Sequence, residues 1–124
     1  MRAFNTLYPR SKVWLEDEEG NLVFGSGRLR ILQAVRDTGS LYAAARELKM
    51  SYRAVWARIH ATEERLGEKL LERQIGGSSG GGSRLTPLAE ALMAHFSEVQ
   101  KSVEAHTDAL FANHLKGRIN IREP

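Results

Sequence analysis

The sequence predicts a mainly α fold with short β-hairpins and one long helix near the C-terminus. Three observations lead to this prediction. Between residues 26 and 66, apolar side chains recur at helical spacing in three runs separated by glycine or serine. Two pairs of short segments flank glycine-containing turns, as in β-hairpins. From residue 87 onward, large apolar side chains recur at spacings of three, four or seven positions, which approximates a heptad repeat.

The 124 residues suit one domain of ordinary size, and their composition limits its chemistry. The absence of cysteine excludes disulfides, iron–sulfur clusters, thiolate zinc sites and a cysteine nucleophile. No apolar run approaches the roughly 20 residues of a membrane span, and the first ten residues do not resemble a signal peptide. We therefore expect a cytoplasmic protein with no membrane partner.

The net charge of +3 is unevenly distributed along the chain. Residues 28–84 contain eleven basic and six acidic residues and carry +5, whereas the segments before and after each carry −1. A basic middle segment favours a polyanionic partner.

A tail of residues 1–11 precedes a predicted hairpin. Its strands are Lys12–Leu15 and Leu22–Phe24, and we expect the acidic residues between them only to solvate the turn. Ser26 is the expected N-cap of the first helix. Gly39 ends this helix, because glycine tolerates the left-handed conformation at a helix C-terminus.

The next two helices are separated by a short break at residues 49–51. Ser40 is the expected N-cap of the second helix and Ser51 that of the third, which ends at Gly67. The core positions of the second helix are Leu41, Ala44, Ala45 and Leu48. The buried stripe of the third is Val55, Ile59, Thr62 and Leu66.

A second hairpin follows, with strands predicted at Lys69–Ile75 and Arg84–Thr86. Its tip contains only glycine and serine: Gly76, Gly77, Ser78, Ser79, Gly80, Gly81, Gly82 and Ser83. This composition predicts a long flexible turn placed like a wing beside the preceding helices.

Thr86 and Pro87 begin the long helix, as N-cap and first helical residue. We expect it to run to about Leu115, and to form a dimerisation helix over residues 87–116 before a C-terminal tail at 117–124. The residues expected at the dimer interface are Leu92, Phe96, Val99, Val103 and Leu110.

Two helices joined by a three-residue break have the spacing of a helix-turn-helix, so residues 12–86 are predicted to be a winged helix-turn-helix DNA-binding domain. An α-helix fits the DNA major groove, and the side chains at its N-terminal end reach base edges. Arg53 can bind guanine through two hydrogen bonds. The residues expected to bind DNA are Ser40, Lys49, Ser51, Tyr52, Arg53, Trp56, Ala57, His60, Arg73 and Arg84.

Several of these segments resemble the DNA-binding domain of LysR-type regulators. They are Gly39–Leu41, Ala44-Ala45, Leu48, Ser51, Ile59, Leu66-Gly67, Leu70–Arg73 and Leu85–Pro87. The N-terminal domain of the molybdate-responsive ModE family is more similar still. The shared features are Ser51–Arg53 with Trp56, the glycine-rich wing before Leu85-Thr86, and the hairpin ending at Gly25 before Gly27-Arg28.

The ModE resemblance covers about residues 12–110 and implies a homodimeric transcription regulator that binds a palindromic operator in double-stranded DNA. Members of that family continue into β-barrel domains that bind molybdate or tungstate. Nothing after Leu115 could form such a domain, so we expect this chain to lack it, as a stand-alone member or as a fragment. Any oxyanion-sensing partner would then be a separate protein.

Other functional classes fit the residues less well. Gly77 and Gly82 have the glycine spacing of a Walker A loop, but Ser83 stands where lysine is required. The histidines (His60, His95, His106 and His114) form no HExxH motif, so we expect no metal site, no cofactor and no enzymatic activity. The alternative function is a protein-interaction or dimerisation module without specific DNA binding. DNA binding requires Lys49, Arg53, Arg73 and Arg84 to lie exposed on one face.

Overall fold

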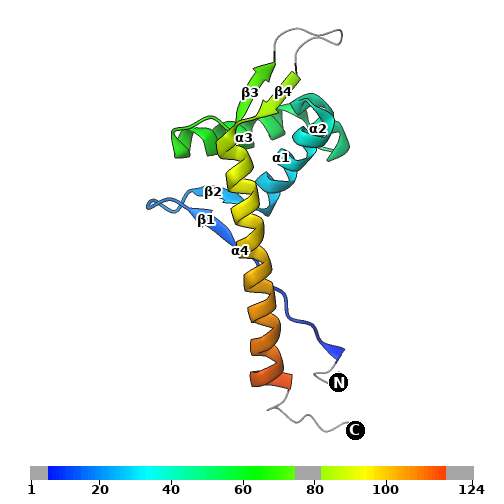
Figure 1. Cartoon of the computed structure of the whole chain (residues 1–124), viewed down its shortest axis with the longest axis vertical. Coiled ribbons are helices and arrows are strands. Elements are labelled where there is room, and N and C mark those ends of the chain that lie inside the picture. Colours follow the sequence, from blue (N-terminus) through cyan, green and yellow to red (C-terminus); the bar gives the residue numbers. More distant parts are fainter. Residues whose placement is uncertain (1–5, 75–81, 117–124) are drawn as a thin grey trace. The chain divides into compact units, whose positions relative to one another are not determined.

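The computed structural model describes residues 6–74 and 82–116, and the chain divides into two compact units. One unit is Trp14–His95, and the other combines the residues up to Val13 with those from Phe96 onward. The first unit contains β1 (Trp14–Glu16), β2 (Leu22–Gly25), α1 (Ser26–Thr38), α2 (Leu41–Glu47), α3 (Tyr52–Leu66), β3 (Leu71–Gln74) and β4 (Gly82–Leu85) (Figure 1). Helix α4 (Pro87–Phe111) and a π-helical turn (Ala112–Lys116) follow. The predicted mainly α fold with two short hairpins and a long final helix is confirmed.

The first hairpin pairs β1 with β2 in antiparallel register, with Trp14 opposite Gly25. The expectation that its acidic turn is only solvated is wrong for Asp17. The carboxylate of Asp17 accepts hydrogen bonds from the backbone amides of Glu19 and Asn21, each at 2.9 Å. These bonds, chiefly that from Asn21, hold the pKa of Asp17 below its ordinary value. Asp17 therefore organises the turn.

Helices α1, α2 and α3 enclose the core of the Trp14–His95 unit. Phe24, Leu32 and Val55 have no exposed surface. Ala44 and Ala45 are 0% and 2% exposed, and their small side chains let α2 pack close to its neighbours. The buried hydroxyl of Thr62 donates a hydrogen bond of 2.6 Å to the Val23 carbonyl, which ties α3 to β2.

Four of the five predicted helix ends between residues 26 and 67 are confirmed. Ser40 and Ser51 accept hydrogen bonds from the amides three residues later, both at 3.0 Å. Gly39 and Gly67 adopt the left-handed conformation, with φ of 84° and 72°. The prediction for Ser26 is wrong, because Gly25 is the N-cap of α1 and makes no side-chain cap. Gly25 is still the last residue of β2, so the helix begins directly after the strand.

Three boundary predictions also need correction. Leu66 is 39% exposed rather than buried, because it is the last residue of α3 and the chain turns at Gly67. Leu48 is half-buried, at the C-cap of α2. Strand β3 begins at Leu71 rather than Lys69, and the fully buried Leu70 precedes it.

The second hairpin pairs β3 with β4, from Leu71 opposite Leu85 to Gln74 opposite Gly82. Gly82 and Ser83 were expected in the flexible tip but belong to β4. The amide of Ser83 donates a hydrogen bond of 2.9 Å to the carbonyl of Gly39, so β4 is held against the α1–α2 turn. The predicted tip residues 76–81 lie outside the described residues.

Helix α4 begins as predicted, since the Thr86 hydroxyl accepts a hydrogen bond of 3.2 Å from the Ala89 amide. Its regular part ends at Phe111, before the expected Leu115, and the π-helical turn continues to Lys116. Phe96 was expected at a dimer interface but is only 3% exposed within this chain. It shares a helix face with the buried Ala89 and Met93 at spacings of seven and three, so it belongs to a buried stripe. None of the described helices is long and apolar enough to span a membrane.

Candidate nucleic-acid interface

The turn between α2 and α3 is tight because one non-glycine residue adopts a left-handed conformation. Lys49 has φ of 56°, and Met50 donates a backbone hydrogen bond of 2.9 Å to the carbonyl of Ala45. The side chain of Ser51 then caps α3. These bonds set the direction in which α3 leaves α2, as a helix-turn-helix requires.

Helix α3 presents its polar side to solvent along its N-terminal half. Arg53 and Ala57 are exposed, and Tyr52 and Trp56 are 48% and 46% exposed. Val55, Ile59 and Thr62 on the opposite side are buried. The helix therefore offers a row of polar and aromatic side chains of the kind that reads base edges.

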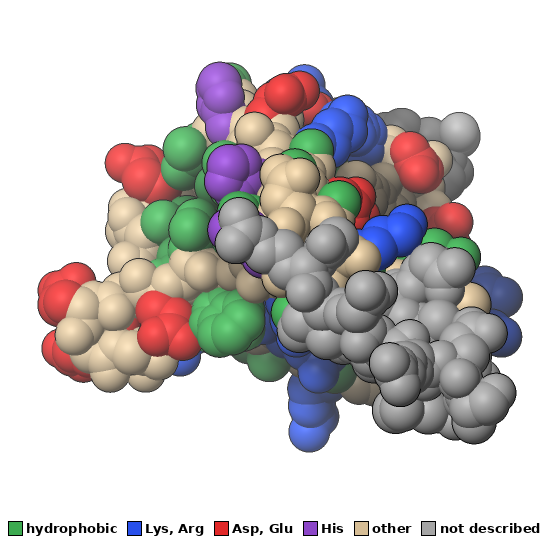
Figure 2. All heavy atoms as spheres, turned by 90° about the horizontal axis from the view of Figure 1, so that it is seen from below, with side chains coloured by type: hydrophobic (Ala, Val, Ile, Leu, Met, Phe, Trp, Pro, Cys, Tyr) green, Lys and Arg blue, Asp and Glu red, His purple; other side chains and the backbone are tan. Residues whose placement is uncertain are grey.

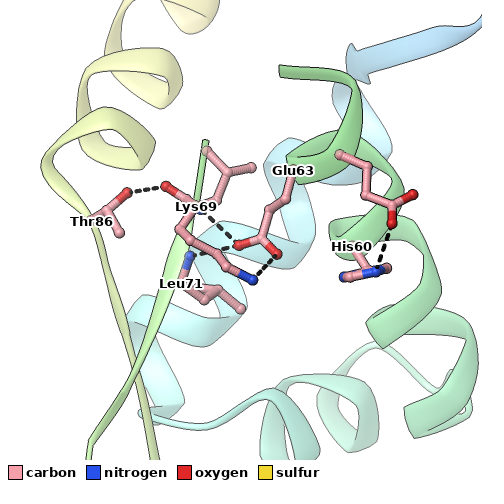
Figure 3. Close-up of polar contacts among 7 residues, drawn as sticks. His60, Glu63, Lys69, Leu71 and Thr86 are labelled. Carbon is pink, nitrogen blue, oxygen red and sulfur yellow. Dashed lines mark hydrogen bonds and ion pairs between the residues drawn. The ribbon is translucent and has the colours of Figure 1, made fainter. Parts of the chain in front are cut away.

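The aromatic side chains on this face are ordered by ring contacts. The Trp56 and His60 rings stack with centroids 4.5 Å apart and planes 15° apart. His60 Nε2 lies 3.2 Å from a carboxylate oxygen of Glu64 (Figure 3). Tyr52 lies against Tyr42 of α2, with ring centroids 6.4 Å apart. The sequence interpretation missed Tyr42, whose position beside Tyr52 depends on the packing of α2 against α3.

A groove of about 320 Å³ lies between α3 and the second hairpin. Four residues expected to bind DNA line it: Tyr52, Trp56 and His60 from α3, and Arg73 from β3. Ser83 of β4, which was expected in the wing, lines it as well. Lys69 also lines the groove and was not predicted. The fold thus joins the proposed reading helix and the wing in one concave surface.

Glu63 fixes the base of the hairpin to α3. Its carboxylate accepts hydrogen bonds from the amides of Leu70 and Leu71, at 2.7 and 3.2 Å, and lies 3.9 Å from the Lys69 ammonium (Figure 3). The Thr86 hydroxyl donates a bond of 2.8 Å to the Lys69 carbonyl. The Glu63 side chain is 11% exposed, so these bonds are shielded from water. Sequence reasoning missed Glu63, because only the fold brings the hairpin to it.

The other residues expected to bind DNA do not line this groove. Lys49, Arg53, Arg73 and Arg84 are all exposed, which meets one part of the condition for DNA binding. The condition that all four lie on one face is not met, because Arg73 pairs with Ser83 and Arg84 with Glu72, so the two arginines point to opposite faces of the hairpin. Arg84 pairs with Glu72 across the hairpin at 3.3 Å, and both side chains are more than half exposed. Such a pair contributes little to stability, so it can exchange for a phosphate contact. Ser40 is half-buried, and its hydroxyl caps α2.

The described residues contain no group of three or more histidine, cysteine or acidic side chains that could hold a metal ion. The groove has arginine, lysine and aromatic side chains on its walls together with Glu63 and Glu72. Basic side chains can pair with phosphate groups, and aromatic side chains can stack on bases or sugars.

Comparison with known proteins places this geometry in a family. Residues 27–90 match the family described as bacterial regulatory helix-turn-helix proteins of the lysR family. The chain is 38% identical over 79 residues to the molybdenum-pterin-binding protein MopB of Rhodobacter capsulatus. The aligned region covers 64% of this chain and 29% of MopB. It is 35% identical over 77 residues to the transcriptional regulator ModE of Haemophilus influenzae. That alignment covers 62% of this chain and 30% of the ModE protein. The chain thus spans under a third of the length of these relatives.

Solved structures agree with these similarities. The structure of the CbnR_DBD–DNA complex superposes with a TM-score of 0.55 at 26% identity, over 70% of this chain and 94% of that one. CbnR itself, a LysR family transcriptional regulator, superposes with a TM-score of 0.52 at 27% identity, over 69% of this chain and 28% of that one. The predicted winged helix-turn-helix and the resemblance to LysR-type and ModE regulators are confirmed. This chain belongs to the LysR family of bacterial regulatory helix-turn-helix proteins.

Proposed function

We propose that this chain is the DNA-binding part of a transcriptional regulator that acts in the cytoplasm, without catalysis, as a homodimer on a palindromic operator. The observation that carries the proposal is the groove in which Tyr52, Trp56 and His60 of α3 face Arg73 of the wing. A helix flanked by a basic hairpin can enter the major groove while the hairpin follows the sugar–phosphate backbone. The similarity to a transcriptional regulator and to a DNA-bound domain supports the same function.

The proposed contacts divide into base reading and phosphate binding. Arg53, near the N-terminus of α3, would bind a guanine through two parallel hydrogen bonds. Trp56, held by its stack on His60, offers a rigid apolar surface for a thymine methyl group or a sugar. Arg73 and Arg84 of the wing would neutralise phosphates, and Arg84 would leave Glu72 to do so.

The proposed dimer uses a second face of α4, beside the stripe that contains Phe96. Val99 and Leu110 are 46% and 47% exposed, and Leu92 and Val103 are half-buried. The face drawn in Figure 2 shows hydrophobic side chains next to histidine side chains. Burying one large apolar side chain stabilises a complex by about 1.5–3 kcal/mol, so a seam of four from each chain suffices for a stable dimer.

Selection of bound sites from random duplex DNA tests the function. We expect an enriched palindrome with half-sites about one helical turn or more apart. On that operator, Arg53→Ala should weaken binding by about 1–3 kcal/mol and relax the preference at one base pair. Lys101→Ala is the matched control, because it removes an exposed charge from α4. If no sequence is enriched, the chain is instead an interaction module.

The dimer is tested separately by sedimentation. Val99→Glu places a charge in the centre of the proposed seam and should convert a dimer at micromolar concentration into a monomer. Glu98→Gln changes the neighbouring, exposed residue and should leave the dimer intact. A wild-type chain that sediments as a monomer at these concentrations would contradict the proposed seam.

A further inference from the structure

A second pocket, of about 300 Å³, opens between α1, the α2–α3 turn and α3. Arg28 and Arg30 line it from α1, and Arg58 lines it from α3. The remaining lining residues are Gly27, Ile31, Leu48 and Met50, so no carboxylate lines this pocket. None of these residues belongs to the contacts proposed so far.

The three arginines are not neutralised within the described residues. The ion pairs of arginine or lysine in the described residues join Arg36 to Glu90, Lys69 to Glu63, and Arg84 to Glu72. None of them involves an arginine of this pocket. Arg58 has only a weak contact of 3.9 Å with the sulfur of Met50. The pocket therefore concentrates positive charge without an acidic partner.

Arg28 shows what this arrangement lacks. Its Nε is buried and has no hydrogen-bond partner among the described residues. Burial lowers the pKa of the Arg28 guanidinium, and the charges of Arg58 and Arg65 lower it further. A buried donor without a partner and a partly desolvated charge are both costly, and an anion in the pocket would offset both costs.

The chemistry of the lining residues suits a phosphate group. Guanidinium groups bind phosphate oxygens through paired hydrogen bonds, and they are more weakly hydrated than an ammonium. Ile31, Leu48 and Met50 give the pocket apolar walls, which strengthen such charge-assisted bonds by excluding water.

We propose that the pocket lined by Arg28, Arg30 and Arg58 binds a phosphate-type oxyanion, supplied by the DNA backbone beside α3. This assignment of the source rests on the proposed function. Met50 lines the pocket and directly precedes Ser51, the cap of α3, so the pocket lies next to the end of the helix proposed to enter the major groove. A strand that passes this end of α3 would place a phosphate over the arginines. The free ion, inorganic phosphate, has the same chemistry and is the other source to be tested.

The first measurement is the salt dependence of DNA binding by the full chain, followed by fluorescence anisotropy with the selected operator. Arg30→Gln/Arg58→Gln changes two exposed residues. It should reduce the slope of log K against log salt by about 0.9, the loss of one phosphate contact. The control, Arg46→Gln/Lys101→Gln, removes two exposed charges that line none of the pockets described above and should leave the slope unchanged. Thermal unfolding confirms that each variant is folded.

The second measurement is a titration of the wild-type chain with inorganic phosphate at constant ionic strength, with chloride as the reference. The NMR signal of the Arg28 Nε–H should shift with phosphate and not with chloride. A reduced slope in the pocket variant alone supports the proposal. An unchanged slope together with a phosphate-dependent shift retains the pocket but overturns its assignment to DNA.

Absence of both effects overturns the pocket altogether. If the wild-type chain binds no duplex, the proposed function fails. The phosphate titration then still decides whether the pocket binds an oxyanion, so the two failures are distinguishable.

Discussion

Replacing Gly82 with alanine should release the wing from the α1–α2 turn. A methyl group at Gly82 would lie 2.6 Å from the carbonyl oxygen of Gly39, closer than a carbon atom and a backbone oxygen tolerate. Both atoms belong to backbone segments that are held by other contacts, so the clash cannot be relieved by a side-chain rotation. Strand β4 must shift, and the Ser83–Gly39 hydrogen bond of 2.9 Å must lengthen or break.

The expected loss of stability follows from two contributions. Overpacking a tight contact costs about 1–3 kcal/mol. Losing one backbone hydrogen bond costs about 0.5–1.5 kcal/mol. Together these predict that Gly82→Ala lowers the free energy of unfolding by about 1.5–4.5 kcal/mol.

Urea unfolding at fixed protein concentration measures this loss, and amide hydrogen exchange of Ser83 reports the bond directly. Gly27→Ala is the matched control, because a methyl group there meets nothing within 4 Å. It should leave the stability unchanged or raise it by up to about 1 kcal/mol, since alanine favours the helix. A Gly82→Ala variant with wild-type stability and a protected Ser83 amide would refute the steric argument.

Two further predictions concern helix α3 and the first hairpin. Ser51→Ala removes the α3 cap and should destabilise the protein by about 0.5–2 kcal/mol in thermal unfolding. Ser51→Asp should retain the cap and the stability but weaken DNA binding through its negative charge, and equal DNA affinity would remove Ser51 from the interface. Because the pKa of Asp17 is lowered on folding, its contribution to stability is present above its unfolded pKa of about 3.9 and is lost as pH falls through the lower folded value. The amide signals of Glu19 and Asn21 should titrate in that range and stop doing so in Asp17→Asn, whereas signals that are identical in the two proteins would contradict this role.

Local signals in the sequence were sufficient for the elements and most helix ends. A serine cap and a terminal glycine are recognised by short-range geometry, as Ser40, Ser51, Gly39 and Gly67 show. The prediction that Ser26 is the N-cap of α1 was wrong because Gly25, the last residue of β2, takes that position. Gly25 is paired with Trp14, which is more than ten positions away and gives no local signal. The boundaries of the two predicted domains, 12–86 and 87–116, stay predictions.

The candidate site was only partly accessible to such reasoning. The buried stripe predicted for α3 is confirmed at Val55, Ile59 and Thr62, and Arg53 and Ala57 are exposed. Periodicity could not separate two neighbouring apolar stripes of α4, so buried Phe96 was grouped with exposed Val99. Both residues are apolar, so their side-chain type does not show which one is buried. Only the packing of the folded chain distinguishes them.

The sequence by itself determined the succession of hairpin, three helices, hairpin and long helix, since caps, glycines and helical spacing act over a few residues. It also determined which face of α3 is polar. The tertiary structure decided which distant groups meet: Glu63 with the amides of Leu70 and Leu71, Gly82 with Gly39, and three arginines around one pocket. These contacts depend on how α1, α3 and the wing pack together. The residues at such contacts are far apart in the sequence, so no short-range sequence pattern indicates that they meet.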